Sequence, residues 1–155
     1  MATPREVYSH NYQHFEDLQL SGKEFYAEIV RRIREYEYPD VASSSRLIRE
    51  SSFLSSRRQY LCIYRGELEF LVCAAPFGRS FFISWYMEER RDPVREFMQR
   101  LPLVGWMFRP APKTYYQLDT ELIFVRSIDA IVRSVIQKVM VEHGFRVSDP
   151  QSLNE

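Results

Sequence analysis

The sequence predicts an α+β fold, in which an antiparallel β-meander of about four to five strands is packed on one face by an N-terminal helix and a long C-terminal helix. Three observations predict it. Residues 60–87 read as three consecutive strands with tight turns at 65–67 and 76–78. A capped amphipathic helix is predicted before this run. After it, a broad apolar stripe of helical period covers residues 124–139.

The first helix has a well-marked start. Residues 21–24 (SGKE) form a capping box, and Leu20 and Phe25 occupy the positions of a hydrophobic staple. Apolar residues then recur at helical spacing until Pro39 stops the helix. Residues 1–20 lack this periodicity, so we expect them to form an N-terminal arm that docks on the domain.

Alternation along the strands assigns their residues to two faces. One face is apolar and should meet the helices; it holds Leu61, Ile63, Leu68, Phe70, Val72 and Ala74. The turn at Gly66 places Tyr60 opposite Cys73 and Cys62 opposite Leu71. The two thiols then share the other face as diagonal neighbours about 7–8 Å apart, which is too far for a disulfide. We therefore expect reduced cysteines in a reducing compartment.

The flanks of the meander are less regular. The Ser-rich stretch 41–56 is compatible with an edge strand near 46–50 and with a loop. Residues 92–93 (Asp-Pro) predict the start of a short helix that ends before Pro102. A last strand is predicted over 114–118 (TYYQL).

The final helix is predicted to begin at Asp119 or Thr120. Its apolar stripe should lie against the sheet and consists of Phe124, Val125, Ile128, Ile131, Val132, Val135, Ile136 and Val139. Gly144 is expected just after the C-cap. A single α+β domain is thus expected over 21–146, followed by a C-terminal tail over 147–155.

Composition and charge limit the function classes. The 155 residues carry 21 basic and 21 acidic side chains, so the net charge is zero, and a neutral chain argues against a nucleic-acid partner. The N-terminus has no apolar signal segment, and no apolar run approaches the roughly 18 residues of a membrane span. We therefore expect a cytoplasmic protein, at most peripheral to the inner membrane.

The run 60–85, with its segments RGEL, CAAPFG and SW, and the segment 114–120 (TYYQLDT) carry a recognisable pattern. They resemble a family of uncharacterised bacterial proteins with the pattern YLxVxRGxLxFxICAAPFGxxFFxSWW followed by TYYxxDT. This chain has Val72 where the pattern has Ile, and Tyr86 where it has a second Trp. The resemblance implies a bacterial source and brings no activity, cofactor or site residue.

The chain contains no recognisable catalytic or cofactor-binding constellation, and we assign it no cofactor and no metal. Cys73 could be a nucleophile, but a buried structural thiol explains it without a partner base. His10 and His14 have the i, i+4 spacing of metal ligands on a helix, yet no third ligand accompanies them. Helix capping accounts for Asp119. An enzyme or small-molecule binder with a pocket between the sheet and the final helix stays an alternative.

Two surfaces are candidates for contact with a partner. The sheet face that points away from the helices could gather four aromatic side chains, those of Tyr60, Tyr64, Phe82 and Tyr86. The loop 101–112 is apolar, interrupted by Pro and Gly, and flanked by basic residues. The candidate contact residues in and beside this loop are Arg100, Leu103, Val104, Trp106, Met107, Phe108 and Arg109. Each surface could instead pack against the chain itself.

These surfaces lead to one functional hypothesis and two alternatives. The hypothesis is a non-catalytic cytosolic binding or assembly module that acts through protein–protein contacts, with a protein partner or a second copy of the chain. The first alternative is a peripheral membrane protein that uses the loop 101–112, because Trp and Phe beside basic residues also suit a bilayer interface. The second is the pocket-containing enzyme or binder described above.

Overall fold

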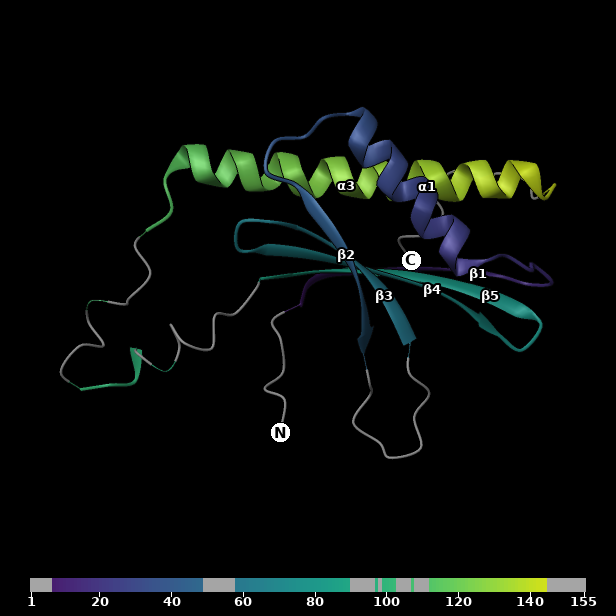
Figure 1. Ribbon diagram of the computed structural model, residues 1–155, viewed down its shortest axis with the longest axis horizontal. Coiled ribbons are helices and arrows are strands. Elements are labelled where there is room, and N and C mark those ends of the chain that lie inside the picture. Colours follow the sequence, from purple (N-terminus) through teal and green to yellow (C-terminus); the bar gives the residue numbers. More distant parts are fainter. Residues whose placement is uncertain are drawn as a thin grey trace, which may run out of the picture.

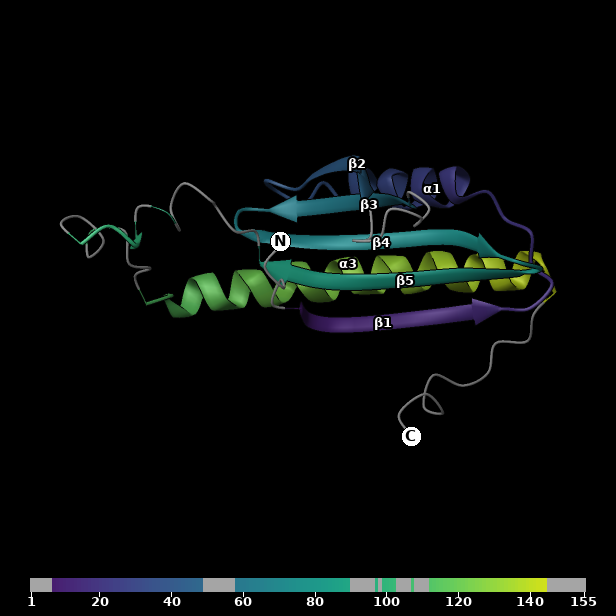
Figure 2. The same cartoon turned by 90° about the horizontal axis from the view of Figure 1, so that it is seen from below.

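The part of the chain that the computed structural model describes forms a five-stranded antiparallel sheet with two helices on one face (Figures 1 and 2). The described residues are 7–48, 58–89, 97, 99–102, 107 and 112–144. In their order across the sheet, the strands are β1 (Val7–Phe15), β5 (Ser80–Glu89), β4 (Leu68–Phe77), β3 (Arg58–Arg65) and β2 (Ala42–Ile48). The helices are α1 (Gly22–Glu35) and α3 (Tyr115–Glu142). The predicted α+β class is confirmed.

The central meander has the predicted register. Tyr60 of β3 pairs with Cys73 of β4, and Gly66 makes the turn between them with a φ of 58°, a conformation that favours glycine. Strand β5 continues the sheet with Ser84 opposite Cys73. This register, which the sequence left open, assigns the apolar residues of β5 to the helix-covered face. They are Phe81, Ile83 and Trp85, and all three are buried.

Strand β1 lies within the predicted N-terminal arm over 1–20 and was not itself predicted. Residues 7–15 pair antiparallel with β5 along its length and form one edge of the sheet, with Phe15 opposite Phe81. The sequence pattern did not predict this strand because Asn11 and Gln13, two of its inward residues, are polar. Gln13 lies under α3, where its side-chain amide donates to the Met140 sulfur at 3.7 Å.

Strand β2 forms the opposite edge and pairs antiparallel with β3. It covers 42–48, and so begins four residues before the expected 46–50 edge strand. Three consecutive Ser residues, 43–45, lie within it. A Ser-rich stretch has low strand propensity, and here the pairing with β3 decides its conformation.

Helix α1 begins where its cap predicts and docks closely on β4. The Ser21 hydroxyl accepts from the Glu24 backbone N–H at 3.4 Å. At Gly22 the helix comes so near the sheet that a Cβ atom would lie 2.7 Å from the Ala74 carbonyl oxygen. The Tyr26 hydroxyl reaches between β3 and β4, where it donates to the Gln59 carbonyl and accepts from the Ala74 N–H, each at 2.7 Å. The hydroxyl thereby joins the two strands at a point where they are not directly paired.

Helix α3 begins earlier than expected, and the predicted strand over 114–118 is wrong. Thr114 is the N-cap: its hydroxyl accepts from the Gln117 N–H at 3.3 Å, while the Gln117 side chain accepts from the Thr114 N–H at 2.9 Å. This reciprocal capping box outweighs the strand propensity of the Tyr-Tyr pair. Asp119 and Thr120, the predicted caps, therefore lie inside the helix.

The apolar stripe of α3 packs on the sheet as predicted. Its buried members are Phe124, Ile128, Ile131, Val132, Val135, Ile136 and Val139, and Val125 is partly buried. A polar contact also fixes the helix on β5: the buried Trp85 indole N–H donates to the Asp129 carboxylate at 2.7 Å. Arg133 pairs with the same carboxylate at 2.7 Å and lies over the Trp85 ring. Gly144, with a φ of 75°, follows the C-cap His143.

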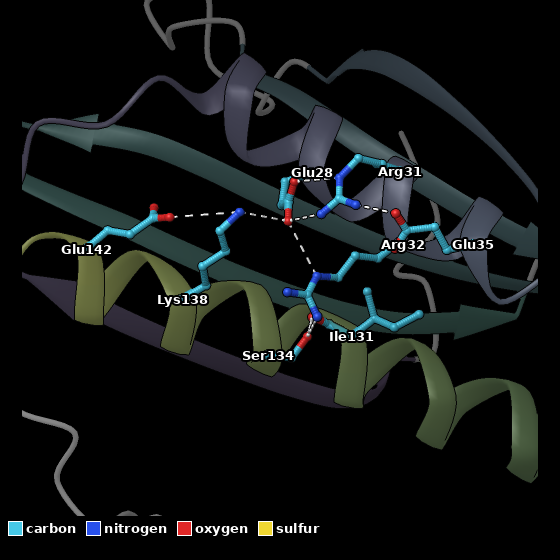
Figure 3. A network of polar contacts seen from close by, with 8 residues as sticks. All are labelled: Glu28, Arg31, Arg32, Glu35, Ile131, Ser134, Lys138 and Glu142. Carbon is cyan, nitrogen blue, oxygen red and sulfur yellow. Dashed lines mark hydrogen bonds and ion pairs between the residues drawn. The ribbon is translucent and has the colours of Figure 1, made fainter.

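A network of charges joins the two helices on their outer side (Figure 3). Glu28 of α1 accepts from Arg31 at 2.6 Å, from Arg32 at 3.4 Å and from Lys138 of α3 at 3.1 Å. Arg32 also donates to Ser134 of α3 at 3.3 Å. The hydrogen bond from Arg31 is the main cause that lowers the pKa of Glu28 from 4.5 to about 2.

Candidate functional site

The sheet face away from the helices, here called the outer face, carries all four aromatic residues predicted for it. Tyr60 and Tyr64 lie on β3, Phe82 and Tyr86 lie on β5, and all are half-buried. The intervening strand β4 separates the two pairs. Its outward residues are Glu69, Leu71, Cys73 and Ala75, so the four rings do not form one cluster.

Strand β1 adds three rings to the outer face that the sequence argument missed. His10 stacks on Tyr86 with ring centroids 4.4 Å apart and an interplanar angle of 1°. Tyr12 stacks on Phe82 at 6.0 Å, and His14 lies opposite Phe82 in the register. In the sequence, rings recur at every second residue, at 10, 12 and 14. This alternation could have indicated a strand with its rings on one face.

The centre of the outer face is buried although no helix of the described chain covers it. Cys62, Leu71, Cys73 and Ser84 are each 2% exposed or less. The two cysteines are not joined by a disulfide. Burial raises the pKa of the neighbouring Tyr60, and the Cys73 thiol adds to the effect. Half-buried rings from β3 and β5 enclose this centre.

Two carboxylates are also buried on the outer face. Glu69 of β4 lies opposite Glu88 of β5, and their residues are only 4% and 7% exposed. Arg46 of β2 reaches Glu69 with an N–O distance of 2.7 Å, so its guanidinium compensates that charge.

An open hollow of about 450 Å³ lies at the opposite end of the outer face. It is lined by Tyr12, His14, Arg58, Ala75, Pro76, Phe77 and Phe82. Phe77 is 70% exposed. The strands β1, β5, β4 and β3 each contribute to the lining, so the shape of the hollow is set by the register of the sheet.

The third candidate region is the first part of α3. The helix has 28 residues and is about 42 Å long, whereas strands of up to ten residues span about 33 Å. Its first turns therefore project beyond the sheet (Figure 1). Five large apolar side chains here are between 47% and 89% exposed: Tyr115, Tyr116, Leu118, Leu122 and Ile123.

The predicted apolar loop falls largely outside the described residues. Leu103, Val104, Trp106, Phe108 and Arg109 are not described, nor is most of the short helix expected after residue 92. Arg100 and Met107, which are described, are exposed.

The geometry bears on the other chemical candidates. His10 and His14 lie on a strand, so roughly 13 Å separates their positions and they cannot share one metal ion. The described residues contain no group of three metal-ligating side chains. Cys73 points away from α3, so it does not face the predicted pocket between the sheet and that helix. No helix in the described ranges is long and apolar enough to cross a membrane.

Compared with known proteins, the chain matches no family model, no curated protein and no solved structure. The functional argument therefore rests on the geometry, and the resemblance to a bacterial family stays a prediction.

Proposed function

We propose that this chain is a non-catalytic assembly module that associates with a second copy of itself through residues 115–123 of α3. We call these residues the inverted segment. One observation carries the proposal: the amphipathic pattern of α3 is reversed there. Gln117 and Glu121 occupy the side of the helix that faces the sheet further along, and the apolar residues occupy the opposite side.

The reversal follows from helical geometry. With about 100° per residue, the five exposed apolar residues fall within an arc of roughly 160°. The centre of this arc lies roughly 150° away from the centre of the stripe that packs on the sheet. Apart from Leu118, which lies in line with Ile136 at the edge of the core stripe, the exposed residues are therefore not an extension of that stripe beyond the sheet. They form a separate apolar face that the described part of the domain does not cover.

The sheet side of the inverted segment has its own role. Lys113 pairs with Glu121 at 2.9 Å and with Glu89 of β5 at 3.6 Å. Glu121 is the main cause that raises the pKa of Lys113. These contacts tie the start of α3 to the end of the sheet through polar groups. The apolar arc is thus held outward on an anchored helix.

The exposed area fits a dimer of modest size. The five side chains expose on the order of 600 Å², taking about 200 Å² for each large side chain at full exposure. Such a patch is at the upper end of what soluble monomers display, where patches are often functional. Two copies would bury about 1,200 Å², the lower limit of specific interfaces.

Charge placement favours an antiparallel, two-fold contact. Asp119 and Arg126 are exposed and lie within the apolar arc, seven residues apart. If two helices pack antiparallel about a point between Leu122 and Ile123, Asp119 of each copy lies opposite Arg126 of the other. Symmetry repeats the pair, and a two-fold contact closes without forming a filament.

The test is a charge exchange followed by sedimentation velocity over a wide concentration range. Wild type should dimerise, and D119R and R126D should each weaken the dimer about tenfold or more, because like charges then meet. The double variant D119R/R126D should restore association to within about threefold of wild type. If each single variant weakened the dimer and the double variant did not restore its affinity, the antiparallel contact would be contradicted.

A second pair of variants tests the apolar arc. L122S should dissociate the dimer, whereas L47S, which alters an exposed Leu on β2, should not. Vesicle co-sedimentation distinguishes self-association from the alternative of peripheral membrane binding. If wild type is monomeric and binds anionic vesicles at low salt through Leu122, the arc serves a bilayer and self-association is wrong.

A further inference from the structure

We propose that the hollow on the outer face binds a small planar aromatic carboxylate, with Arg58 holding the carboxylate and the surrounding rings holding the aromatic body. This site shares no residue with the inverted segment, and it lies on the sheet face opposite the helices. The inference is therefore independent of self-association.

The shape of the hollow suits a small molecule. Its volume of about 450 Å³ is within the range of roughly 300–1,000 Å³ that is usual for such sites. Tyr12 and Phe82 are already stacked on one another. Phe77 stands mostly exposed beside them at the end of β4, and Ala75 leaves room between the rings. A flat ligand can lie against ring faces whose positions the sheet has fixed.

The charge of the hollow selects an anion. Arg58 is half-buried, and among the described residues no acidic side chain lines the hollow and none forms an ion pair with Arg58. Arg46, in contrast, lies on the next strand and is paired with Glu69. Because no described carboxylate pairs with it, the Arg58 guanidinium beside the apolar rings can offer a ligand carboxylate two parallel hydrogen bonds. His14 supplies a further polar group at the rim.

The described lining of the hollow holds one guanidinium, which argues for one carboxylate rather than a polyanion. Binding to a nucleic-acid strand draws on several cations that follow the phosphates. Among the described residues of the outer face, the charges beyond Arg58 are the paired Arg46 and the carboxylates of Glu69 and Glu88. These carboxylates would repel a strand that extended out of the hollow.

The test compares naphthoate with its neutral analogue naphthalenemethanol by calorimetric titration. Wild type should bind naphthoate, and R58Q should weaken that binding at least about tenfold while changing the affinity for the neutral alcohol less than about twofold. F77S should weaken both ligands, because it removes a ring wall. R34Q, an exposed Arg on α1 across the sheet, should change neither.

Three results would overturn the proposal: no saturable binding of naphthoate, equal affinity for the neutral alcohol, or unchanged affinity in R58Q. Tighter binding of adenosine monophosphate than of naphthoate would assign the hollow to nucleotides and also overturn it. Circular dichroism of each variant establishes that the fold is retained. D119R should bind naphthoate as wild type does, so a failure of the dimer and a failure of this site give different results.

Discussion

The two faces of the same sheet are buried in different ways. The inner face is apolar along the central strands, and α1 and α3 cover it (Figure 2). On the outer face, two cysteines, a serine and two glutamates are buried among rings from neighbouring strands. Within the described chain, the helical layer thus lies on the uninterrupted apolar face, whereas the mixed face holds its buried polar groups among side chains of the sheet itself.

The largest expected difference between the faces comes from two adjacent residues on β5. Phe81 points inward and is fully buried, and Phe82 points outward and is half-buried. F81A should lower the free energy of unfolding by about 3–5 kcal/mol, because it opens a cavity in a packed core. F82A should cost about 1–2 kcal/mol, because part of the ring is already in water.

Urea denaturation of the two variants checks this difference, with unchanged m-values as the sign that the unfolding transition is comparable. Equal losses would mean that the outer face is packed as tightly as the inner face. In that case, the outer face would not be the less tightly packed of the two.

The next effect tests a polar contact inside the inner face. Burial raises the pKa of Tyr26 to about 12, so its hydroxyl stays a donor at neutral pH. Y26F should cost about 1–3 kcal/mol, because the buried Ala74 N–H and the Gln59 carbonyl both lose their partner. Y12F, on the outer face and 65% exposed, is the control and should stay within about 0.5 kcal/mol of wild type. If Y26F lowered the free energy of unfolding as little as Y12F does, water would be replacing the Tyr26 hydroxyl.

Much of the fold was predictable because its signals are local. The β3–β4 register follows from the turn at Gly66, and the α1 start follows from its cap. The strand β1 was missed because Asn11 and Gln13 face inward, which removes the apolar alternation of a half-buried strand. Residues 114–118 were misassigned because their aromatic pair has strand propensity, while the capping box that makes them helical spans only Thr114 and Gln117.

The candidate sites were harder to predict, because they depend on positions that only the fold brings together. Alternation placed Tyr60 and Tyr64 on the outer face, whereas the positions of Phe82 and Tyr86 also needed the register of β5, which the sequence left open. The hollow needs β1 and the start of β3 at the same end of the sheet, so His14 and Arg58 could not be related from sequence. The reversed pattern of α3 was hidden by the strand assigned to its first turn.

The smallest expected effect concerns how the two helices on the inner face are held together. The folded-state pKa of Glu28 is about 2, below its usual 4.5, so the unfolded chain binds more protons between these values. The stabilisation is therefore complete above about pH 4.5 and is lost as the pH falls through about 2. Because the Glu28 side chain keeps 19% of its surface exposed, screening should hold the effect to about 1 kcal/mol or less.

E28Q should thus be less stable than wild type near neutral pH, and the difference in thermal unfolding midpoint should disappear toward pH 2. E16Q is the control, since Glu16 is exposed and belongs neither to α1 nor to this charge network. Added salt should reduce the E28Q difference at neutral pH. A difference that persists unchanged at pH 2 would mean that Gln alters helix packing rather than charge, and that the contact from α1 to Lys138 contributes nothing to holding the helical layer on the inner face.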